Sequence, residues 1–500
     1  MIDDARRVYA SAANQGGHVP KAIAPFALRA VRTATAEDTI WSEVSEQAFR
    51  RLLVELEERT NAVPIDVVTA DVQPDGRADG DPACLPLSVE KQVADDFAYL
   101  AAVTEGAQSV AAVCVEQHIC HSTTTTTTTT TTRLVLRIAG MDVVVENVRA
   151  MLKDVCIILE GVAACRLDVN HEGRNEIFAV VVRQHRQKLL GRMRSRKWVK
   201  PKYLSKQHKK PLWKDFDNVI HRAPHVYPKK RDCRTRDLVI QSLTAMQARY
   251  TRYEDVNDDD GSANLLHLQD LVKATYDFCK LPEIAAFAAH FEDISSPTPQ
   301  VGAVIKTLRQ LEKIGAYWRI SMDLASAAGQ YSQSFQSIHL AYVTPYAEVP
   351  TDIAYESWAK TMHVHAEVQL LVEYAMRKQG EHHHDDKNKL VIIWPRTIGT
   401  SKYLCYLCYL FLTEHGGFGT ALSSHGRLFD QWTVPDLSEF DAQTQGIFAN
   451  VLERVYRRVE WQLGSTREPV RWRSEPMTSR QSLIMHVGGR AIPVDPPLVT

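Results

Sequence analysis

The first 120 residues carry two stretches of helix-like hydrophobic pattern. In the first stretch, four apolar residues repeat at i, i+3, i+4 and i+7, which predicts an amphipathic helix. These residues are Phe49, Leu52, Leu53 and Leu56. Residues 61–95 are rich in Pro, Asp and Gly and predict a loop, whereas residues 96–120 are rich in Ala and Val and predict a second helix. We therefore expect residues 1–122 to form a helical N-terminal region.

A run of ten threonines, Thr123–Thr132, interrupts this pattern. Threonine is β-branched, so the run disfavours helix and favours extended backbone. We interpret it as a low-complexity surface linker. Leu134–Ile138 and Val143–Val145 then predict short strands, and they open a mixed region that covers residues 133–232.

Helical spacing returns in residues 233–329. Its apolar positions include Leu238, Leu243, Met246, Leu265, Leu268, Leu271 and Val272. Phe335–Val343 predicts a strand that leads into a C-terminal domain over residues 330–460. For residues 461–500, a C-terminal tail, the sequence indicates no function.

The C-terminal domain contains a helix–strand–helix pattern. A helix is expected from about Thr361 to Lys378, because the apolar residues at 364, 368, 371 and 375 share one face. Leu390–Trp394 is short, rich in β-branched residues and followed by Pro395, which predicts a buried strand. A second helix is expected to start near Ser401, a suitable N-cap residue.

The composition is that of an ordinary globular protein. The chain has 500 residues, which suggests about two to four domains, and the hydrophobic share is 45% with a net charge of −1. No apolar run is long enough for a membrane span, and no secretory signal is evident at the start. Nine cysteines without a repeated spacing favour a reducing compartment, so we expect an intracellular protein, cytoplasmic or nuclear, that does not bind membranes. The oligomeric state is not indicated.

Only residues 183–231 have a strong positive bias. They contain seventeen Lys and Arg residues together with four interspersed aromatic residues, Trp198, Tyr203, Trp213 and Tyr227. Such a segment is most often a solvated linker or an import signal. It is also able to neutralise phosphates and stack on bases, so single-stranded DNA or RNA is a candidate partner.

Four residues of the C-terminal domain suggest a zinc site. His365 and Glu367 stand near the start of the first helix, and Cys405 and Cys408 form a C-x-x-C pair on the second. Zinc prefers nitrogen and thiolate ligands, and three protein ligands leave a fourth position for a water whose pKa the metal lowers. Glu367 would take the proton of that water, as in the H-x-E and C-x-x-C pattern of zinc deaminases. One alternative is a pair of buried structural cysteines with an unrelated histidine. The other is a closed structural zinc site, whose fourth ligand would be one of His363, His382–His384, His415 and His425.

Residues of about 355–440 resemble the fungal deaminase-like family of the cytidine deaminase-like superfamily. The resemblance lies in the segments around His365, around Cys405 and around His425, and in Trp432. It implies an α/β fold with three α/β/α layers and one zinc ion, in which His365, Cys405 and Cys408 are ligands and Glu367 carries protons. The superfamily has proline before the first cysteine, where this chain has Leu404.

The resemblance also implies a nucleobase substrate. The hypothesis is that activated water displaces the amino group of a cyclic amidine, with Glu367 moving the protons. Four residues are candidates for contact with the substrate, namely Trp394, Tyr403, His425 and Trp432. The several hundred additional residues favour a base within a nucleic acid or a nucleotide over a free nucleoside. The alternative is a catalytically silent deaminase fold that serves as an interaction module.

Overall fold

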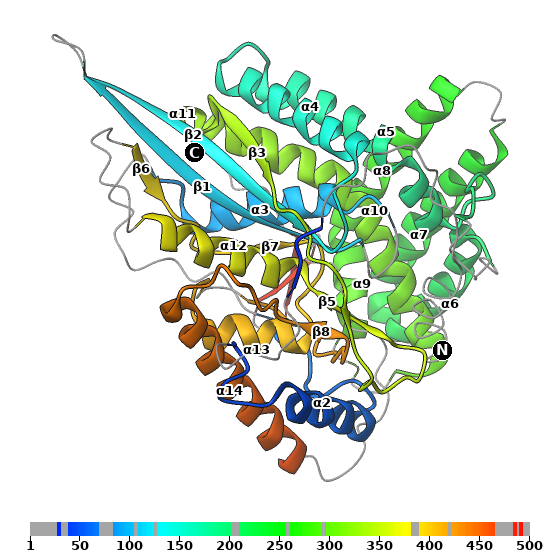
Figure 1. Cartoon of the computed structure of the whole chain (residues 1–500). Coiled ribbons are helices and arrows are strands. Elements are labelled where there is room, and N and C mark those ends of the chain that lie inside the picture. Colours follow the sequence, from blue (N-terminus) through cyan, green and yellow to red (C-terminus); the bar gives the residue numbers. More distant parts are fainter. Residues whose placement is uncertain are drawn as a thin grey trace.

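The structure is a computed structural model of the whole chain (Figure 1). It describes residues 28–31, 39–69, 84–104, 109–123, 128–201, 210–256, 261–292, 294, 297–381, 390–418, 422–465, 484–487 and 490–493. Within these ranges, no helix is long and apolar enough to cross a membrane.

Helices dominate the described residues between positions 146 and 335, and strands lie before and after that stretch. The α-helices are α2 (Glu46–Thr60), α3 (Leu87–Ala101), α4 (Glu146–Ala163), α5 (Arg174–Met193), α6 (Phe216–Val226), α7 (Cys233–Asp255), α8 (Gly261–Lys280), α9 (Pro282–Glu292), α10 (Pro299–Gln330), α11 (Ser332–Phe335), α12 (Ala366–Glu381), α13 (Tyr406–His415) and α14 (Ala442–Ser465). The strands are β1 (Ala111–Thr123), β2 (Thr128–Gly140), β3 (Ile338–Tyr342), β4 (Val349–Pro350), β5 (Thr361–Val364), β6 (Leu390–Ile393), β7 (Gly399–Thr400), β8 (Trp432–Thr433), β9 (Ile484–Val487) and β10 (Arg490–Pro493).

The main sheet has the order β3-β2-β1-β6, and β7 also pairs with β1. β1 is antiparallel to β2, β6 and β7, whereas β2 and β3 are parallel. Strands from the first third of the chain therefore pair directly with strands that flank the expected metal site. The sheet crosses the domain boundary that we expected at residue 330, because backbone pairing does not follow the order of segments in the sequence.

Helices cover both faces of this sheet. Side chains alternate between the faces along β1, so Val113 and Val115 join one hydrophobic core and Ala112 and Cys114 join the other. The first core also contains buried residues of α3, α4 and α10, and the second contains buried residues of α12 and α13. Figure 1 shows α4 and α12 on opposite sides of β1 and β2. The architecture of the described residues is mixed α/β.

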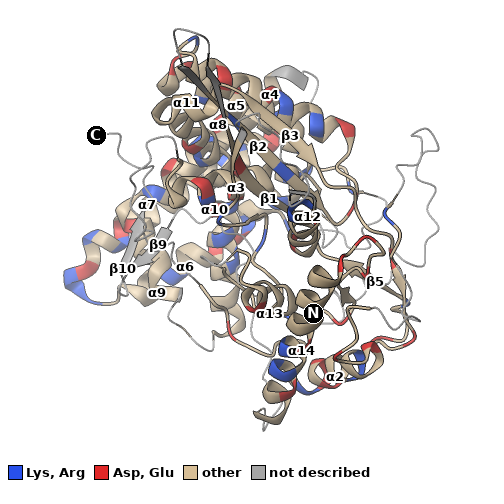
Figure 2. Cartoon of the chain, turned by 60° about the vertical axis from the view of Figure 1, so that its left-hand side comes forward, with Lys and Arg blue, Asp and Glu red and all other residues tan. Residues whose placement is uncertain are grey.

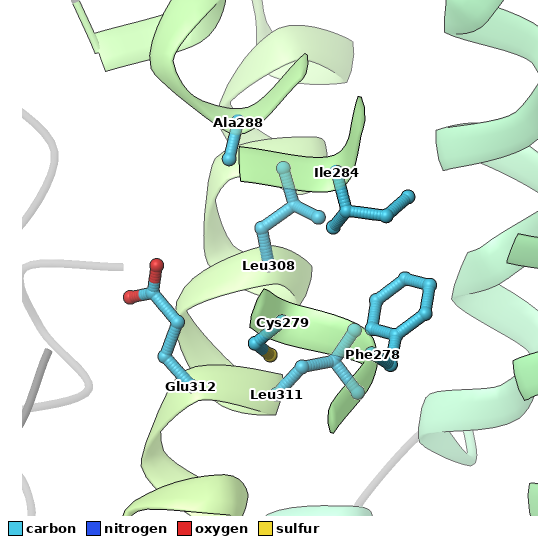
Figure 3. A pocket seen from close by; sticks show the side chains of 7 residues that line it. All are labelled: Phe278, Cys279, Ile284, Ala288, Leu308, Leu311 and Glu312. Atoms are coloured by element: carbon cyan, nitrogen blue, oxygen red, sulfur yellow. The ribbon is translucent and has the colours of Figure 1, made fainter. Parts of the chain in front are cut away.

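The first core continues into a helical region made of α4 to α10. Its centre is α10, which runs for 32 residues and packs against α5 and α8. A small cavity lies between α8, α9 and α10, where Phe278, Ile284 and Leu308 line it together with Cys279 (Figure 3). The expectation of helices in residues 233–329 is confirmed.

The second core joins the two ends of the chain. α2 packs against α14, and both contribute to the same core as the residues around the cysteine pair. A smaller sheet, β4-β5-β8, lies next to them. Arg50 of α2 is buried and donates to the backbone carbonyl of Trp432 at 2.8 Å and to the Thr433 hydroxyl at 2.9 Å. α2, from the expected helical N-terminal region, therefore packs in the same hydrophobic core as the cysteine pair.

Several local expectations were wrong. Residues 96–120 are not one helix, because α3 ends at Ala101 and β1 begins at Ala111. α3 itself begins inside the expected loop, at Leu87. Apolar Ala and Val side chains fit a strand buried on both faces as well as a helix, so their spacing did not distinguish the two.

The threonine run also differs from the linker that we expected. Its last five residues begin β2 and pair with β1, in the register Thr132 with Ile119 and Thr128 with Thr123. Extended backbone suits β-branched threonine, and pairing then satisfies its backbone groups. The strand expected at Val143–Val145 is absent, because these residues lead into α4, whose N-cap is Val145. β3 confirms the strand expected within Phe335–Val343.

Candidate metal centre

His365 lies at the junction between β5 and α12. β5 pairs in parallel with β8, with His363 opposite Trp432, and the chain then turns into α12 at Ala366. The backbone carbonyl of His365 accepts a hydrogen bond from Gln369 at 3.0 Å, so it belongs to the first turn of the helix. The helix therefore starts five residues later than expected, and a strand occupies positions 361–364. His365 is half-buried at this junction.

The cysteine pair lies at the start of α13. Cys405 is the N-cap residue, and its Sγ accepts the backbone N–H of Cys408 at 3.3 Å. The expected cap, Ser401, instead contacts the first residue of β1, whose N–H donates to the Ser401 hydroxyl at 3.1 Å. A thiolate at an N-cap is stabilised by the partial positive charge of the helix terminus. The helix start therefore fixes both sulfur atoms and favours the ionised form of Cys405, the N-cap residue.

The three expected ligands come together. The ligand atoms of His365, Cys405 and Cys408 all lie within 4.8 Å of one another. Nδ1 of His365 is 3.5 Å from Sγ of Cys405 and 3.4 Å from Sγ of Cys408. Tetrahedral zinc with ordinary Zn–N and Zn–S bonds places such atoms about 3.5 Å apart, so the donor set fits zinc.

The set is open for a further ligand. Within the part of the chain that the structure describes, no fourth His, Cys, Asp or Glu joins this group. His415 contacts the Phe448 ring instead, with 5.7 Å between ring centroids. His382–His384, which are further candidates for a fourth ligand, lie outside the described residues. Three protein ligands with an open position are typical of catalytic zinc sites, whereas structural sites are closed by four.

The electrostatics of the ligands favour metal binding. Burial opposes ionisation of Cys405, but hydrogen bonds from Cys408 and the imidazole of His365 outweigh it and hold the pKa of this thiol well below its usual value. Burial and the neighbouring sulfur of Cys405 raise the pKa of Cys408. One anionic sulfur beside one neutral sulfur is the arrangement expected for two coupled thiols without a cation. A divalent cation would allow both to ionise.

Glu367 lies beside the ligands. It belongs to the first turn of α12, is buried, and its Oε2 is 3.6 Å from Sγ of Cys408. Burial raises the pKa of this carboxyl, and His365 opposes the change. A carboxylate next to the ligands but outside the ligand set is placed to exchange protons with a molecule in the open position.

His425 and Phe429 flank the imidazole of His365. The Phe429 ring lies 6.3 Å from that of His365 and 6.0 Å from that of His425. Burial and the charges of Arg427 and Lys402 lower the pKa of His425 to about 3, so it is neutral at physiological pH. Its placement requires Gly426, which has a φ of 72° and where a Cβ would lie 2.1 Å from the carbonyl oxygen of Ile65.

Two of the other expected substrate contacts lie elsewhere. Trp432 is fully buried behind the cysteines, and its ring packs against Phe411 and Phe49. Trp394 follows β6 and contacts Arg377, whose guanidinium is 4.9 Å from the ring centroid. Arg377 is ten residues along α12 from Glu367, which corresponds to roughly 15 Å of helix. The structure therefore does not bring Trp394 to the metal ligands.

The strand before Trp394 is also less buried than expected. β6 lies at the edge of the main sheet, and Val391 is 48% exposed. Tyr403 is half-buried two residues before the cysteine pair. Phe429, Lys402 and Arg427 lie close to the ligands, but nothing in the sequence distinguished them from other aromatic and basic residues. They approach the site because residues 423–427 run beside residues 404–406.

The segment before the cysteines is held by α3. Glu90 accepts from the backbone N–H and the Nε of Arg396, at 2.7 and 2.8 Å. Thr400 donates its backbone N–H to Asp95 at 2.9 Å. Gly399 allows this close approach, because a Cβ there would lie 2.1 Å from the backbone of Ala94. α3 therefore contributes directly to the position of the candidate metal ligands.

The basic segment 183–231 is largely folded. It runs through the second half of α5 and through α6, and Trp198 and Trp213 pack against the helical core. Some of its charges are paired, as Arg194 is with Asp215. Figure 2 shows Lys and Arg alternating with Asp and Glu along most helices. Tyr203 lies outside the described residues.

Comparison with known proteins identifies one family. No curated protein and no solved structure matches the chain. A family model described as OTT_1508_deam-like deaminase matches residues 364–436. This range starts just before His365 and includes Glu367 and both cysteines. The segment that holds the candidate metal centre is therefore similar to a deaminase family of the cytidine deaminase-like type.

Proposed function

We propose that this protein is a zinc-dependent hydrolytic deaminase that acts on a nucleobase, more readily within a nucleic acid or a nucleotide than in a free nucleoside. The observation that carries this proposal is the meeting of His365, Cys405 and Cys408 within 4.8 Å, with Glu367 beside them. The match of this segment to a deaminase family supports it. We also propose that this segment belongs to the fungal deaminase-like family that it resembles and has the three-layer α/β/α fold of that family.

Each residue has a role in this reaction. His365, Cys405 and Cys408 would hold zinc, which acts as a Lewis acid and lowers the pKa of a water molecule. Glu367 would accept a proton from the reacting water, donate it to the ring nitrogen of the base and then assist the departure of ammonia. Its position in the first turn of α12 directs the carboxylate to the same point as the ligands.

Phe429 and His425 are the substrate contacts that the geometry favours most. Phe429 is half-buried and lies against His365, so its ring offers a face on which a planar base can stack. His425 is neutral and offers a hydrogen bond to a base. Tyr403 is a further proposed contact with the substrate. Trp432 is not among the proposed substrate contacts, because its ring is enclosed by the core.

The experiment measures zinc content and ammonia release in the same preparations. The zinc-loaded full chain is incubated with nucleosides, nucleotides and single-stranded DNA and RNA. Glu367→Gln should keep zinc bound but lower ammonia release by roughly 100-fold or more, because only the proton carrier is lost. Glu373→Gln, on the same helix and away from the ligands, is the matched control and should leave both unchanged.

Two results would contradict the proposal. Loss of zinc from Glu367→Gln would mean that Glu367 has a structural role. Full zinc occupancy without ammonia from any substrate would favour the alternative, an interaction module that has kept the metal site but not the reaction.

A further inference from the structure

Gln369 is a buried polar residue of α12 that holds the backbone around the candidate ligand His365. Its side chain is 1% exposed. Its backbone N–H donates to the carbonyl of His365 at 3.0 Å, and its Nε2 donates to the carbonyl of Val364 at 2.9 Å. These two carbonyls belong to the peptide groups on either side of His365. Gln369 therefore fixes the backbone both before and after this ligand.

The same amide also reaches the main sheet. Nε2 of Gln369 donates to the carbonyl of Gly140, the last residue of β2, at 3.0 Å. Both partners of Nε2 are carbonyl oxygens, so only the NH2 end of the amide can face them. Oε1 of Gln369 is buried and has no hydrogen-bond partner among the described residues. An unpaired buried oxygen costs free energy, so filling space in the core does not explain a glutamine at this position.

Gly140 connects Gln369 to the segment that carries the cysteine pair. It lies directly opposite Ala111 in the antiparallel pairing of β1 and β2. Ala111 exchanges two hydrogen bonds with Ser401: its N–H donates to the Ser401 hydroxyl at 3.1 Å, and its carbonyl accepts the Ser401 N–H at 3.0 Å. Ser401 is buried and precedes Cys405 by four residues. The pair Ala111–Gly140 is therefore bonded to the histidine segment on one side and to the cysteine segment on the other.

A shared anchor matters because the candidate ligands come from two separate elements. His365 lies at the start of α12, and the cysteine pair lies at the start of α13. Tyr374 and Arg377 of α12 also bond to the main sheet, through a carboxylate of β1, but roughly two and a half turns beyond His365 or further. Metal–ligand distances vary by only about 0.2 Å, so a small shift of one segment against the other weakens metal binding.

We infer that Gln369 and Ser401 are positioning residues that set the separation of His365 from the cysteine pair, by fixing both segments to Ala111–Gly140. Each acts through the backbone beside a ligand and does not touch the reacting atoms. The inference rests on the proposed function, because it assigns both residues to the same metal centre. The family match includes Gln369 and Ser401 but not Ala111 and Gly140. The site thus depends on a part of the chain outside the matched segment.

The test measures the metal site without turnover. Zinc affinity of the full chain is determined by competition with a chelator, and cobalt(II) replaces zinc because its visible spectrum reports the geometry of its ligands. Gln369→Met keeps the length of the side chain but has no N–H donor, so it should weaken zinc binding by about tenfold and change the cobalt spectrum. Ser401→Ala should have the same two effects. Because it removes only one hydrogen bond, Ser401→Ala tests the anchor even if Gln369→Met does not fold.

Gln117→Met is the matched control. Gln117 is a buried glutamine of β1 whose Oε1 accepts the N–H of Leu85 at 2.8 Å. Its replacement also removes a buried hydrogen bond, so urea unfolding should show a loss of stability. Zinc affinity and the cobalt spectrum of Gln117→Met should not change. If Gln369→Met loses stability but keeps the native zinc affinity and cobalt spectrum, as this control does, its role is structural only and the inference is wrong.

The double variant tests whether the anchor is shared. If both segments depend on one residue pair, releasing either of them already separates the ligands. Gln369→Met combined with Ser401→Ala should then bind zinc only about tenfold more weakly than the native chain. Two independent effects would multiply to about 100-fold and would overturn the shared anchor.

The outcome for the metal site is separate from the outcome for the reaction. Native zinc affinity and an unchanged cobalt spectrum in folded Gln369→Met and Ser401→Ala would overturn the inference, whether or not the protein releases ammonia. If the native chain releases no ammonia from any substrate while both variants alter the metal site, the proposed function fails and the positioning role does not.

Discussion

Asp95 of α3 accepts the backbone N–H of Thr400 at 2.9 Å. The same carboxylate accepts Nζ of Lys91 at 2.6 Å, and both of these side chains are buried. Thr400 precedes Cys405 by five residues. α3 is thus bonded to the segment that supplies two of the three candidate metal ligands.

Asp95→Ala should destabilise the protein by roughly 3–5 kcal/mol, because it leaves the Lys91 ammonium and the Thr400 N–H buried without an acceptor. Asp95→Asn, which keeps an acceptor for Thr400, should cost less. Urea unfolding measures both. An unfolding midpoint of Asp95→Ala equal to that of the native chain would show that the contact with α3 contributes little.

Cys405→Ser should abolish zinc binding, because a hydroxyl is a poor zinc ligand at neutral pH. Serine is also a good N-cap residue, so α13 should still begin at the same place and the effect should be limited to the metal. Elemental analysis of purified protein measures this loss. Cys165→Ser, which changes an exposed cysteine, is the control and should retain zinc. Full zinc in Cys405→Ser would remove Cys405 from the ligand set.

Trp432→Phe should weaken zinc binding by about tenfold. The indole nitrogen of Trp432 is buried and has no hydrogen bond of ordinary geometry among the described residues. It faces Cys408 and lowers the pKa of that thiol, which favours the thiolate. Partners of metal ligands typically change affinity by this amount or more. Competition with a chelator measures the affinity. Trp394→Phe removes an indole away from the ligands, and an equal loss in that variant would contradict a specific role for Trp432.

Lowering the pH should destabilise the protein, because it protonates the Glu116 carboxylate. This buried carboxylate of β1 accepts hydrogen bonds from Arg137, Tyr374 and Arg377, at 2.8, 2.8 and 2.7 Å. Burial opposes ionisation, but bonds from His118 and Arg137 outweigh it and lower the pKa of Glu116 from 4.5 to about 2. The folded pKa lies below the unfolded one. The resulting stabilisation, on the order of 3 kcal/mol, is therefore complete above pH 4.5 and is lost as the pH falls towards 2.

Glu116→Gln is the matched variant for this effect. It should be less stable than the native chain at pH 7, and the difference should shrink as the pH is lowered from 4.5 to 2. Chemical unfolding across this range measures both stabilities. A difference that does not depend on pH would show that ionisation of Glu116 does not stabilise the fold.

The sequence by itself determined which side chains form the candidate site. The types and spacing of His365, Cys405 and Cys408 predicted the donor set that the structure brings together, because zinc favours nitrogen and thiolate ligands. Helical spacing predicted α2 and the helices between residues 233 and 329, since a face buried along a helix leaves a local periodic pattern.

Only the tertiary structure decided which segments build the domain around the site. The pairing of β1 with β6 and β7, and the contact between Asp95 and Thr400, join residues about 300 positions apart. Such contacts depend on packing between distant segments and leave no local period in the sequence. For the same reason, only the tertiary structure placed Trp432 behind the candidate ligands, where its ring packs against Phe411 and Phe49.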